Sequence, residues 1–241
     1  MTDVHSHIMF DVDDGSYSIE ESIALIKELK SVGFDNIILT PHYIENTQYK
    51  DNKYRVANDE KEEKFNILKE AVKKEKIDIN LFLGNEIFIS KNIVDLVLEN
   101  EIHPLANSKY LLIEFSLNNQ TLNVGDVLYE IQNKGYTPII AHPERYIYFQ
   151  NNYKLVDNLK KEGILFQCNY ASILGLYGKK ASKLFKYMLK NKYVDYLGTD
   201  IHHMSNKFVI DNFSKIEKKI IKYSNIDYYN KIKDNCNKLV K

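Results

Sequence analysis

Short, continuously apolar segments recur along this chain, and most of them follow a stretch in which apolar residues have helical spacing. In the first such pair, a Ser18–Glu21 capping-box pattern starts a predicted helix that ends at Gly33, and the apolar segment 36–40 follows. Continuously apolar strands are typical of parallel sheets that are buried on both faces, so the alternation predicts an α/β fold. The seven predicted strands lie in residues 3–7, 36–40, 80–83, 110–113, 138–141, 164–166 and 193–198.

Two stretches fall outside this alternation. Residues 44–64 are rich in polar and charged side chains and predict a surface loop that leads into a charged helix. Residues 208–240 carry two helical patterns, which predict helices covering the outside or the bottom of the fold. We find no linker or second domain, so we expect one domain over 1–241, with C-terminal helices within 207–241 packed on it.

Side chains that can bind metal follow nearly every predicted strand. They are His5, His7, His42, Glu86, Glu114, His142, Asp200 and His202. A closed barrel brings the ends of all its parallel strands around one centre, so this placement favours a barrel. An open doubly wound sheet would also fit the alternation, but the first strand–helix turn lacks the glycine-rich dinucleotide pattern of such folds.

The N-terminal segment Asp3-Val4-His5-Ser6-His7 carries the densest part of this pattern. In an extended segment alternate side chains share a face, so Asp3, His5 and His7 point the same way. Two imidazoles about 7 Å apart along a strand can converge on one ion. Asp3 sits where a carboxylate behind the ligands could orient one of the rings. The alternative is a polar face on an edge strand.

A single histidine or carboxylate at a strand end is most simply a hydrogen-bonded residue, but the whole set predicts a multinuclear metal centre. Several imidazoles and carboxylates in one barrel mouth would be desolvated or mutually repulsive without cations. The ligands are nitrogen and oxygen only, which argues against a structural zinc site and for Mn²⁺, Fe, Zn²⁺ or Mg²⁺ in a catalytic role. So many ligands suit two or three ions, and such clusters catalyse hydrolysis.

Arg145 follows His142 by three residues in the sequence Ala-His-Pro-Glu-Arg. On a loop just above the metals, its guanidinium would clamp a phosphate in a bidentate manner. A surface salt bridge is the alternative role for this arginine.

Composition excludes several other classes of function. The 33 Lys and Arg balance 33 Asp and Glu, so charge gives no case for nucleic acid as the partner. The two cysteines cannot form a disulfide framework, which suits a reducing compartment. The polar N-terminus shows no leader and no apolar run reaches the ~18 residues of a membrane span, so we expect a cytoplasmic protein without membrane insertion. The sequence leaves open whether the chain forms a homo-oligomer.

The two cysteines do not fit a cysteine-dependent phosphatase. That chemistry needs an arginine six residues after the nucleophile, and Leu174 occupies this place after Cys168. Cys236 has no room for the loop, because the sequence ends at Lys241. We expect Cys168 to be a packed strand residue.

Seven motifs together resemble the PHP (polymerase and histidinol phosphatase) superfamily, and most closely its bacterial protein-tyrosine phosphatase branch, found with capsule and exopolysaccharide loci. The motifs are Asp3-x-His5-x-His7, Asp13-Asp14-Gly15, Thr40-Pro41-His42, Gly84-Asn85-Glu86, Ile113-Glu114, Ala141-His142-Pro143-Glu144-Arg145 and Gly198-Thr199-Asp200-Ile201-His202. The resemblance implies a distorted (β/α)7 TIM-like barrel with a trinuclear, typically manganese-dependent centre. It also implies a partner, the phosphotyrosine-bearing tail of the bacterial tyrosine autokinase that governs chain export.

The resemblance also implies roles for single residues. One metal would be held by His5, His7, Glu86 and Asp200; a second, bridged by Glu86, by Glu114 and His142; and a third by Asp14, His42 and His202. Arg145 matches the phosphate-binding arginine of the family. Lys207 stands where the family commonly has a further arginine, so it is a candidate substrate-binding residue that lacks the fork geometry. Arg145, His42 and Lys207 are the expected catalytic residues.

We therefore expect direct attack of a metal-bound hydroxide on phosphotyrosine, without a phosphoenzyme. Tyrosinate is a tolerable leaving group because the pKa of tyrosine is about 10, and a nearby histidine could assist its protonation. The alternative is a small-molecule phosphatase of the same superfamily, of the histidinol-phosphate type; a DNA-end phosphoesterase or a non-catalytic binding module fits less well. The aromatic residues expected near the mouth are Tyr43, Tyr146, Tyr148 and Phe149.

Overall fold

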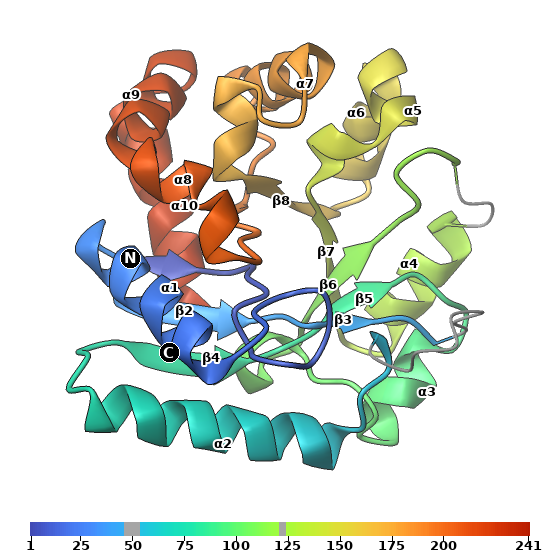
Figure 1. The fold of residues 1–241 in the computed structure, drawn as a ribbon. Coiled ribbons are helices and arrows are strands. Elements are labelled where there is room, and N and C mark those ends of the chain that lie inside the picture. The colour runs from blue at the N-terminus through green and yellow to red at the C-terminus, as the bar shows by residue number, and fades with distance from the viewer. Residues whose placement is uncertain (46–53, 121–123) are drawn as a thin grey trace.

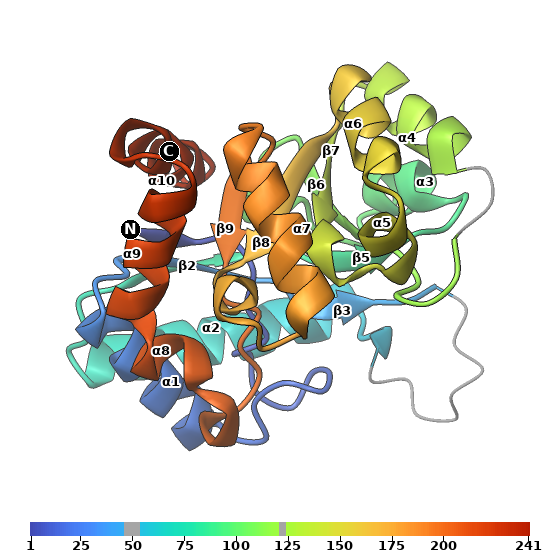
Figure 2. The same cartoon turned by 90° about the horizontal axis from the view of Figure 1, so that it is seen from above.

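The computed structural model describes residues 1–45, 54–120 and 124–241, and within them every strand pairs in parallel with its neighbours. One sheet has the order β1-β2-β4 and the other has the order β3-β5-β6-β7-β8-β9. The strands are β1 (Thr2–Asp3), β2 (Asn36–Leu39), β3 (His42–Tyr43), β4 (Asn80–Leu83), β5 (Glu86–Phe88), β6 (Tyr110–Glu114), β7 (Thr137–Ala141), β8 (Leu165–Asn169) and β9 (Tyr196–Gly198). Figures 1 and 2 show them curling around the middle of the molecule.

The predicted strands 36–40 and 80–83 correspond to β2 and β4, and each is followed by a second short strand beyond its predicted end. The segment from β2 to β3 is interrupted at Thr40–Pro41, where proline lacks the N–H that a sheet ladder needs. The segment from β4 to β5 is interrupted at Gly84–Asn85, and the Asn85 side chain donates a hydrogen bond to the Pro41 carbonyl at 2.9 Å. Past both interruptions, His42 and Glu86 are register partners. The two sheets are thus joined through these segments.

The N-terminal segment that follows β1 also lies beside the segment that follows β9. The Asp200 N–H donates to the His5 carbonyl and the His7 N–H donates to the Ile201 carbonyl, both at 2.9 Å. On its other side, the Thr40 N–H donates to the Ser6 carbonyl at 2.8 Å. The predicted α/β fold with a curled parallel sheet is confirmed.

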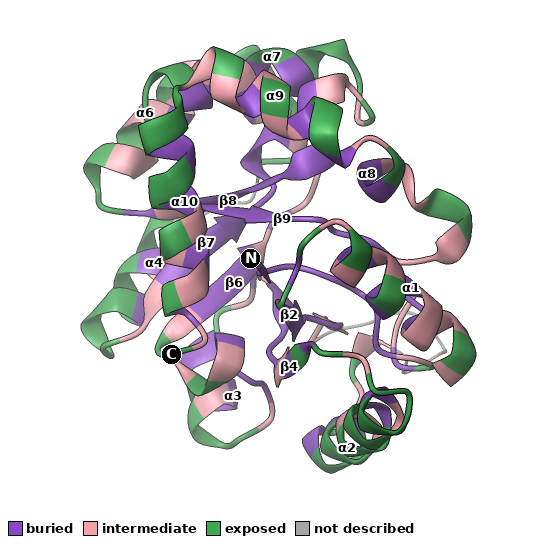
Figure 3. Cartoon of the chain, turned by 90° about the vertical axis from the view of Figure 1, so that its left-hand side faces the viewer, coloured by how far each residue is buried: buried purple, intermediate pink, exposed green. Residues whose placement is uncertain are grey.

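Helices surround this sheet, with their exposed sides outward and the strands buried inside (Figure 3). They are α1 (Ile19–Ser31), α2 (Asn58–Lys74), α3 (Ile93–Leu98), α4 (Val124–Asn133), α5 (Ile147–Asn151), α6 (Tyr153–Lys161), α7 (Lys179–Lys190), α8 (Phe208–Asp211), α9 (Phe213–Tyr223) and α10 (Ile226–Lys238), with short 3₁₀ turns between them. Ser18 caps α1 as predicted, since its hydroxyl accepts from the Glu21 N–H at 3.3 Å. In the described part of the chain no helix is long and apolar enough to cross a membrane.

The two stretches outside the alternation form helices. Residues 208–240 contain α8, α9 and α10, and the Tyr228 hydroxyl on α10 donates to the Val194 carbonyl beside β9 at 2.7 Å. The predicted charged helix within 44–64 is the start of α2 at Asn58. Within the predicted loop of the 44–64 stretch, residues 46–53 lie outside the described residues.

Candidate metal centre

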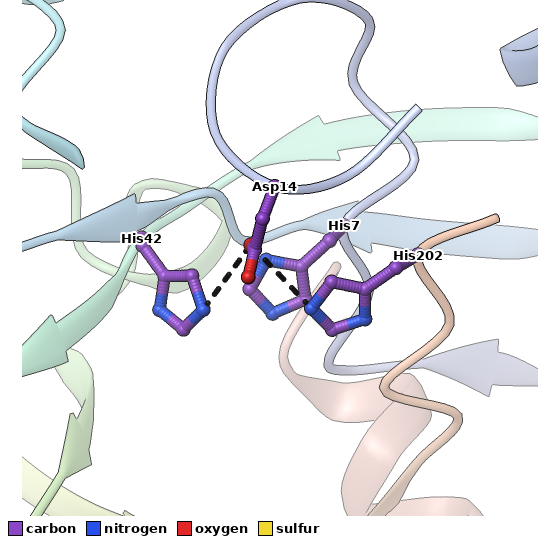
Figure 4. A group of neighbouring side chains, drawn as sticks. All are labelled: His7, Asp14, His42 and His202. Carbon is purple, nitrogen blue, oxygen red and sulfur yellow. Dashed lines mark ion pairs between the residues drawn. The ribbon is translucent and has the colours of Figure 1, made fainter. Parts of the chain in front are cut away.

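Four side chains that can bind metal lie close together and face one another (Figure 4). They are His7, Asp14, His42 and His202. Asp14 Oδ1 lies 3.6 Å from His42 Nε2 and 3.6 Å from His202 Nε2, and the His7 ring lies behind it. The loop that carries Asp14 approaches the backbone of His7 closely at Gly15. A Cβ at that position would stand 2.0 Å from the His7 carbonyl oxygen, so the approach requires glycine.

Glu86 lies at the centre of the site and is almost fully buried. Its Oε2 is 3.3 Å from His5 Nε2, 3.2 Å from His7 Nε2 and 3.0 Å from His42 Nδ1. Its Oε1 is 2.8 Å from His142 Nε2. One carboxylate therefore faces four imidazoles.

Asp200, Glu114 and His142 complete the group. Asp200 Oδ1 is 3.6 Å from Nε2 of both His5 and His7, and Glu114 Oε1 is 3.7 Å from His142 Nε2. Asp200 and His142 both have positive φ angles, of 53° and 30°. Such backbone strain in non-glycine residues is concentrated at functional sites, where the surrounding structure holds a side chain in place.

The donor set fits divalent cations. His5 Nε2 and His7 Nε2 stand 3.1 Å apart. The buried atoms Asp14 Oδ1, His42 Nδ1 and Glu86 Oε2 have no hydrogen-bond partner among the described residues. Buried charges without such partners are usually paired with other charges or coordinate metals. In the part of the chain that the structure describes, the ligand atoms within 4.8 Å of one another form four overlapping sets, which include all nine predicted ligands: His5, His7, Asp14, His42, Glu86, Glu114, His142, Asp200 and His202.

Burial and neighbouring charges shift the pKa values of the residues in this group in different directions. Burial raises the pKa of Glu86, but the charges of His5 and His42 outweigh it and hold this pKa well below its usual range. Burial and the charge of Glu86 raise the pKa of Glu114 well above its usual range. Burial, together with the positive charge of Arg145, lowers the pKa of His142 to about 4. Its imidazole is therefore neutral near pH 7, which is the form that binds metal.

A second layer of polar side chains orients the rings. His7 Nδ1 lies 2.7 Å from Asp13 Oδ2, and His5 Nδ1 lies 2.9 Å from Gln167 Oε1. The prediction that Asp3 orients a ring is wrong, because its carboxylate accepts hydrogen bonds from the backbone N–H and the hydroxyl of Thr199 instead. It thereby joins the ends of β1 and β9. Asp13 could have been found from its place in the Asp-Asp-Gly motif, whereas Gln167 carried no signal.

Arg145 lies at the same site. Its Nη1 is 2.7 Å from Asp200 Oδ2, and its guanidinium carbon is 4.6 Å from the centre of the Tyr177 ring. Asn169 Nδ2 donates to the same Asp200 oxygen at 2.6 Å. Tyr177 and Asn169 were both missed by the sequence analysis.

The structure does not bring Lys207 to this group. Its ammonium forms ion pairs with Asp211 at 3.0 Å and with Glu28 at 3.6 Å, and it does not line the cavity in the described part of the chain. Asp211 is one helical turn further on, so the lysine is engaged locally. The substrate-binding and catalytic roles predicted for Lys207 therefore find no support in its contacts.

A cavity of about 470 Å³ opens above these residues. In the described part of the chain it is lined by Asp14, His42, Glu86, Glu114, His142, Asp200 and His202, by Arg145, and by Ile44, Tyr54 and Phe88. The aromatic residues expected at the mouth are elsewhere: Tyr43, Tyr146 and Phe149 are buried in the core, and Tyr148 faces another cavity. Neither cysteine is among the lining residues; both are buried, and burial raises the pKa of the Cys168 thiol well above its usual range.

Comparisons with known proteins point to one group. A family model described as "Capsular polysaccharide synthesis, CpsB/CapC" matches residues 1–241. The chain is 37% identical over 209 residues to CapC of Staphylococcus aureus, a provisionally named tyrosine-protein phosphatase; the match covers 86% of this chain and 79% of CapC. It is 32% identical over 212 residues to the tyrosine-protein phosphatase CpsB of Streptococcus pneumoniae, covering 86% of this chain and 85% of CpsB.

A solved structure has the same fold. It comes from work on YwqE of Bacillus subtilis and CpsB of Streptococcus pneumoniae, which describes them as metal-dependent tyrosine phosphatases. The match has a TM-score of 0.90 at 25% sequence identity and covers 100% of this chain and 94% of that one.

Proposed function

This chain belongs to the CpsB/CapC family of capsular polysaccharide synthesis proteins, and from that membership and the geometry of the site we propose that it is a metal-dependent phosphatase acting on phosphotyrosine in proteins. The observation that carries the proposal is the pairing of two features in one cavity. The cavity contains a cluster of imidazoles and carboxylates centred on Glu86, and it also contains the guanidinium of Arg145. Cations and a guanidinium together are suited to a dianionic phosphate monoester.

We propose the following ligand assignment. His5, His7, Glu86 and Asp200 hold one ion; Glu86, Glu114 and His142 hold a second; and Asp14, His42 and His202 hold a third. The clustering of donor atoms supports it: one set contains His5, His7 and Asp200 of the first ion, and another contains all three ligands of the third ion together with His7. Nitrogen and oxygen donors without thiolate suit Mn²⁺, while Fe, Zn²⁺ and Mg²⁺ have the same donor preference. Two or three ions would occupy the site.

When bound, divalent cations supply Lewis-acid chemistry, which polarises the phosphoryl group and makes water nucleophilic near neutral pH. The protein's own groups bind and orient the substrate. Arg145 binds phosphoryl oxygens in a bidentate manner, and Asp200 and Tyr177 hold its guanidinium toward the cavity. No protein nucleophile is required.

The leaving group places a modest demand on the protein. Tyrosinate has a conjugate acid with a pKa of about 10, so its oxygen needs less help from an acid than an alkoxide does. His42 and His202 have the most exposed imidazole rings of the cluster, with 14% and 24% of the side chain accessible. Both rings are proposed metal ligands, so neither is assigned as the proton donor, and water in the cavity protonates the leaving oxygen.

We further propose that the scaffold is a distorted (β/α)7 barrel and that residues 1–241 form one domain. The described residues contain seven strand segments when β2 with β3 and β4 with β5 are each taken as one. The hydrogen bonds between residues 5–7 and 200–201 support closure of the ring. The proposed substrate is a phosphotyrosine-bearing bacterial tyrosine kinase that controls capsular polysaccharide synthesis, and the proposed location is the cytoplasm.

Direct comparison of substrates tests this function. Purified protein with added Mn²⁺ is expected to hydrolyse a phosphotyrosine peptide with a kcat/KM at least about tenfold above that for histidinol phosphate. The opposite preference would assign the site to a small-molecule phosphatase. A matched phosphoserine peptide serves as the control for peptide binding.

A further inference from the structure

Two apolar side chains lie directly beyond two of the proposed metal ligands. On the paired parallel strands β3 and β5, His42 and Glu86 are register partners. Side chains two residues apart in an extended segment share a face, so Ile44, the residue after β3, follows His42 on the cavity side, and Phe88 follows Glu86. All four line the cavity. The strand rise places the apolar pair about 6.6 Å further along the strands than the ligand pair.

These apolar side chains are not part of the hydrophobic core. Ile44 and Phe88 are half-buried, and within the described residues neither belongs to the core cluster or to the partly buried side chains packed against it. The Ile44 N–H donates to the Tyr54 carbonyl at 2.7 Å, which holds Tyr54 beside them. The Tyr54 ring in turn stands edge-on to the His42 ring, with the centres 5.8 Å apart.

The remaining surface of the cavity is charged or ionisable. In the described part of the chain, every lining residue other than Ile44, Tyr54 and Phe88 is an Asp, Glu, His or Arg. The cavity therefore has an inner layer suited to a phosphate and one apolar wall above it. Unless it covers a ligand, such a wall leaves apolar surface facing water beside a polar site.

We infer that Ile44 and Phe88, together with Tyr54, form the surface on which the aryl ring of the substrate packs, and that this wall selects aryl phosphates over alkyl phosphates. With the phosphate in the inner layer, the ring of a phosphotyrosine lies at the depth of the wall. A phosphoserine, which has one methylene group between its phosphate oxygen and the backbone, would bring polar backbone there instead. The inference rests on the proposed function, because it places the phosphate at the metal cluster.

Binding of two phosphonates tests the inference without any turnover. Phenylphosphonate and methylphosphonate carry the same charged group, are not hydrolysed, and differ in the ring alone. Isothermal titration calorimetry of the Mn²⁺-loaded protein is expected to show phenylphosphonate binding at least about tenfold more tightly. In Phe88→Ala this ratio is expected to fall about fivefold, with methylphosphonate affinity changed less than twofold. In Ile44→Ala the same ratio of affinities is expected to fall by a smaller factor.

Ile67→Ala on α2 is the matched control, because Ile67 is an exposed apolar residue that is not among the described residues lining the cavity. Phe88→Leu, which keeps apolar volume, should retain most of the preference and replaces Phe88→Ala if thermal denaturation shows that the alanine variant does not fold. An unchanged ratio in the wall variants, or no preference in the wild type, overturns the inference. If the protein binds phenylphosphonate tightly but cannot hydrolyse phosphotyrosine, the proposed function is overturned. The inference that the wall binds an aryl ring is then retained.

Discussion

Arg145 and Asp200 form an ion pair in the cavity, with 2.7 Å between the arginine Nη1 and the carboxylate Oδ2. The other carboxylate oxygen, Oδ1, lies 3.6 Å from Nε2 of both His5 and His7. One buried carboxylate thus connects the proposed phosphate-binding group to the proposed metal ligands. The two functions of the site are expected to respond together when either residue is changed.

Arg145→Lys is expected to lower kcat/KM for a phosphotyrosine peptide about a hundredfold. Lysine keeps the positive charge but cannot present two parallel N–H donors. A hydrogen bond to a charged group contributes about 1.5–3 kcal/mol, and a hundredfold loss corresponds to about 2.7 kcal/mol. Steady-state kinetics and the inhibition constant of inorganic phosphate measure the effect. A change below threefold would remove Arg145 from phosphate binding.

Lys207→Ala provides the matched comparison. Because the Lys207 ammonium pairs with Glu28 and Asp211, its removal is expected to change kcat/KM by less than twofold. The same assays apply. A loss as large as that of Arg145→Lys would mean that Lys207 reaches the substrate after all.

Tyr177 is expected to act as a positioning residue for Arg145. Its ring lies 4.6 Å from the guanidinium, a cation–π geometry that contributes about 1–2 kcal/mol when partly desolvated. Tyr177→Leu should therefore weaken inhibition by inorganic phosphate and raise KM by about five- to tenfold, with little effect on kcat. Tyr177→Phe keeps the ring and should behave like the wild type within about twofold. Equal losses in both variants would point to the hydroxyl instead.

Asp13→Asn is expected to weaken metal binding. Asp13 lies 2.7 Å from His7 Nδ1, and carboxylates that orient a metal-binding imidazole typically contribute 10- to 100-fold in affinity. Calorimetric titration with Mn²⁺ measures the change. Asp11→Asn is the control, since Asp11 is an exposed residue that pairs with Lys64. Wild-type affinity in a folded Asp13→Asn protein would contradict this role.

Lys61 is expected to make the free energy of unfolding depend on pH. Its ammonium is buried against Asn85 Oδ1 at 3.1 Å, and burial lowers its pKa to about 7, although Glu101 and Glu62 oppose the shift. In the unfolded chain the pKa of lysine is about 10.4. Between pH 7 and 10 the unfolded state therefore binds more protons, and the free energy of unfolding rises with pH through this group.

Lys61→Met should abolish that rise, which amounts to at most about 1.4 kcal/mol per pH unit. Urea denaturation of both proteins at pH 7, 8 and 9 measures the two slopes. Parallel slopes would show that Lys61 stays protonated in the folded protein across this range.

Much of this fold follows from local patterns in the sequence. The capping box at Ser18 and the apolar segments of β6, β7 and β8 specify their elements through short-range chemistry. The short strands β3 and β5, which follow Pro41 and Asn85, were not predicted, because they depend on how neighbouring strands approach. An added Cβ at Gly84, for example, would stand 2.9 Å from Leu105, and no local pattern reveals such a contact.

In the site, too, some residues could be predicted from local sequence patterns and others could not. The nine clustered donors could be predicted because each follows an apolar strand or lies in a recognisable motif. Gln167, Asn169 and Tyr177 could not, because their importance comes from tertiary contacts with His5, Asp200 and Arg145. The apolar wall was likewise misplaced: Tyr146 was an obvious candidate by its nearness to Arg145, yet its side chain packs in the core.

The most direct test of the metal centre is the Mn²⁺ stoichiometry of chelator-treated protein, measured together with the return of phosphatase activity. Two or three ions per chain are expected to bind, and activity on p-nitrophenyl phosphate should be lost on chelation and restored as the sites fill. Alkylation of the buried thiols of Cys168 and Cys236 should leave most of the activity in place. Full activity in protein that holds no metal, with loss of activity on alkylation, would contradict the account.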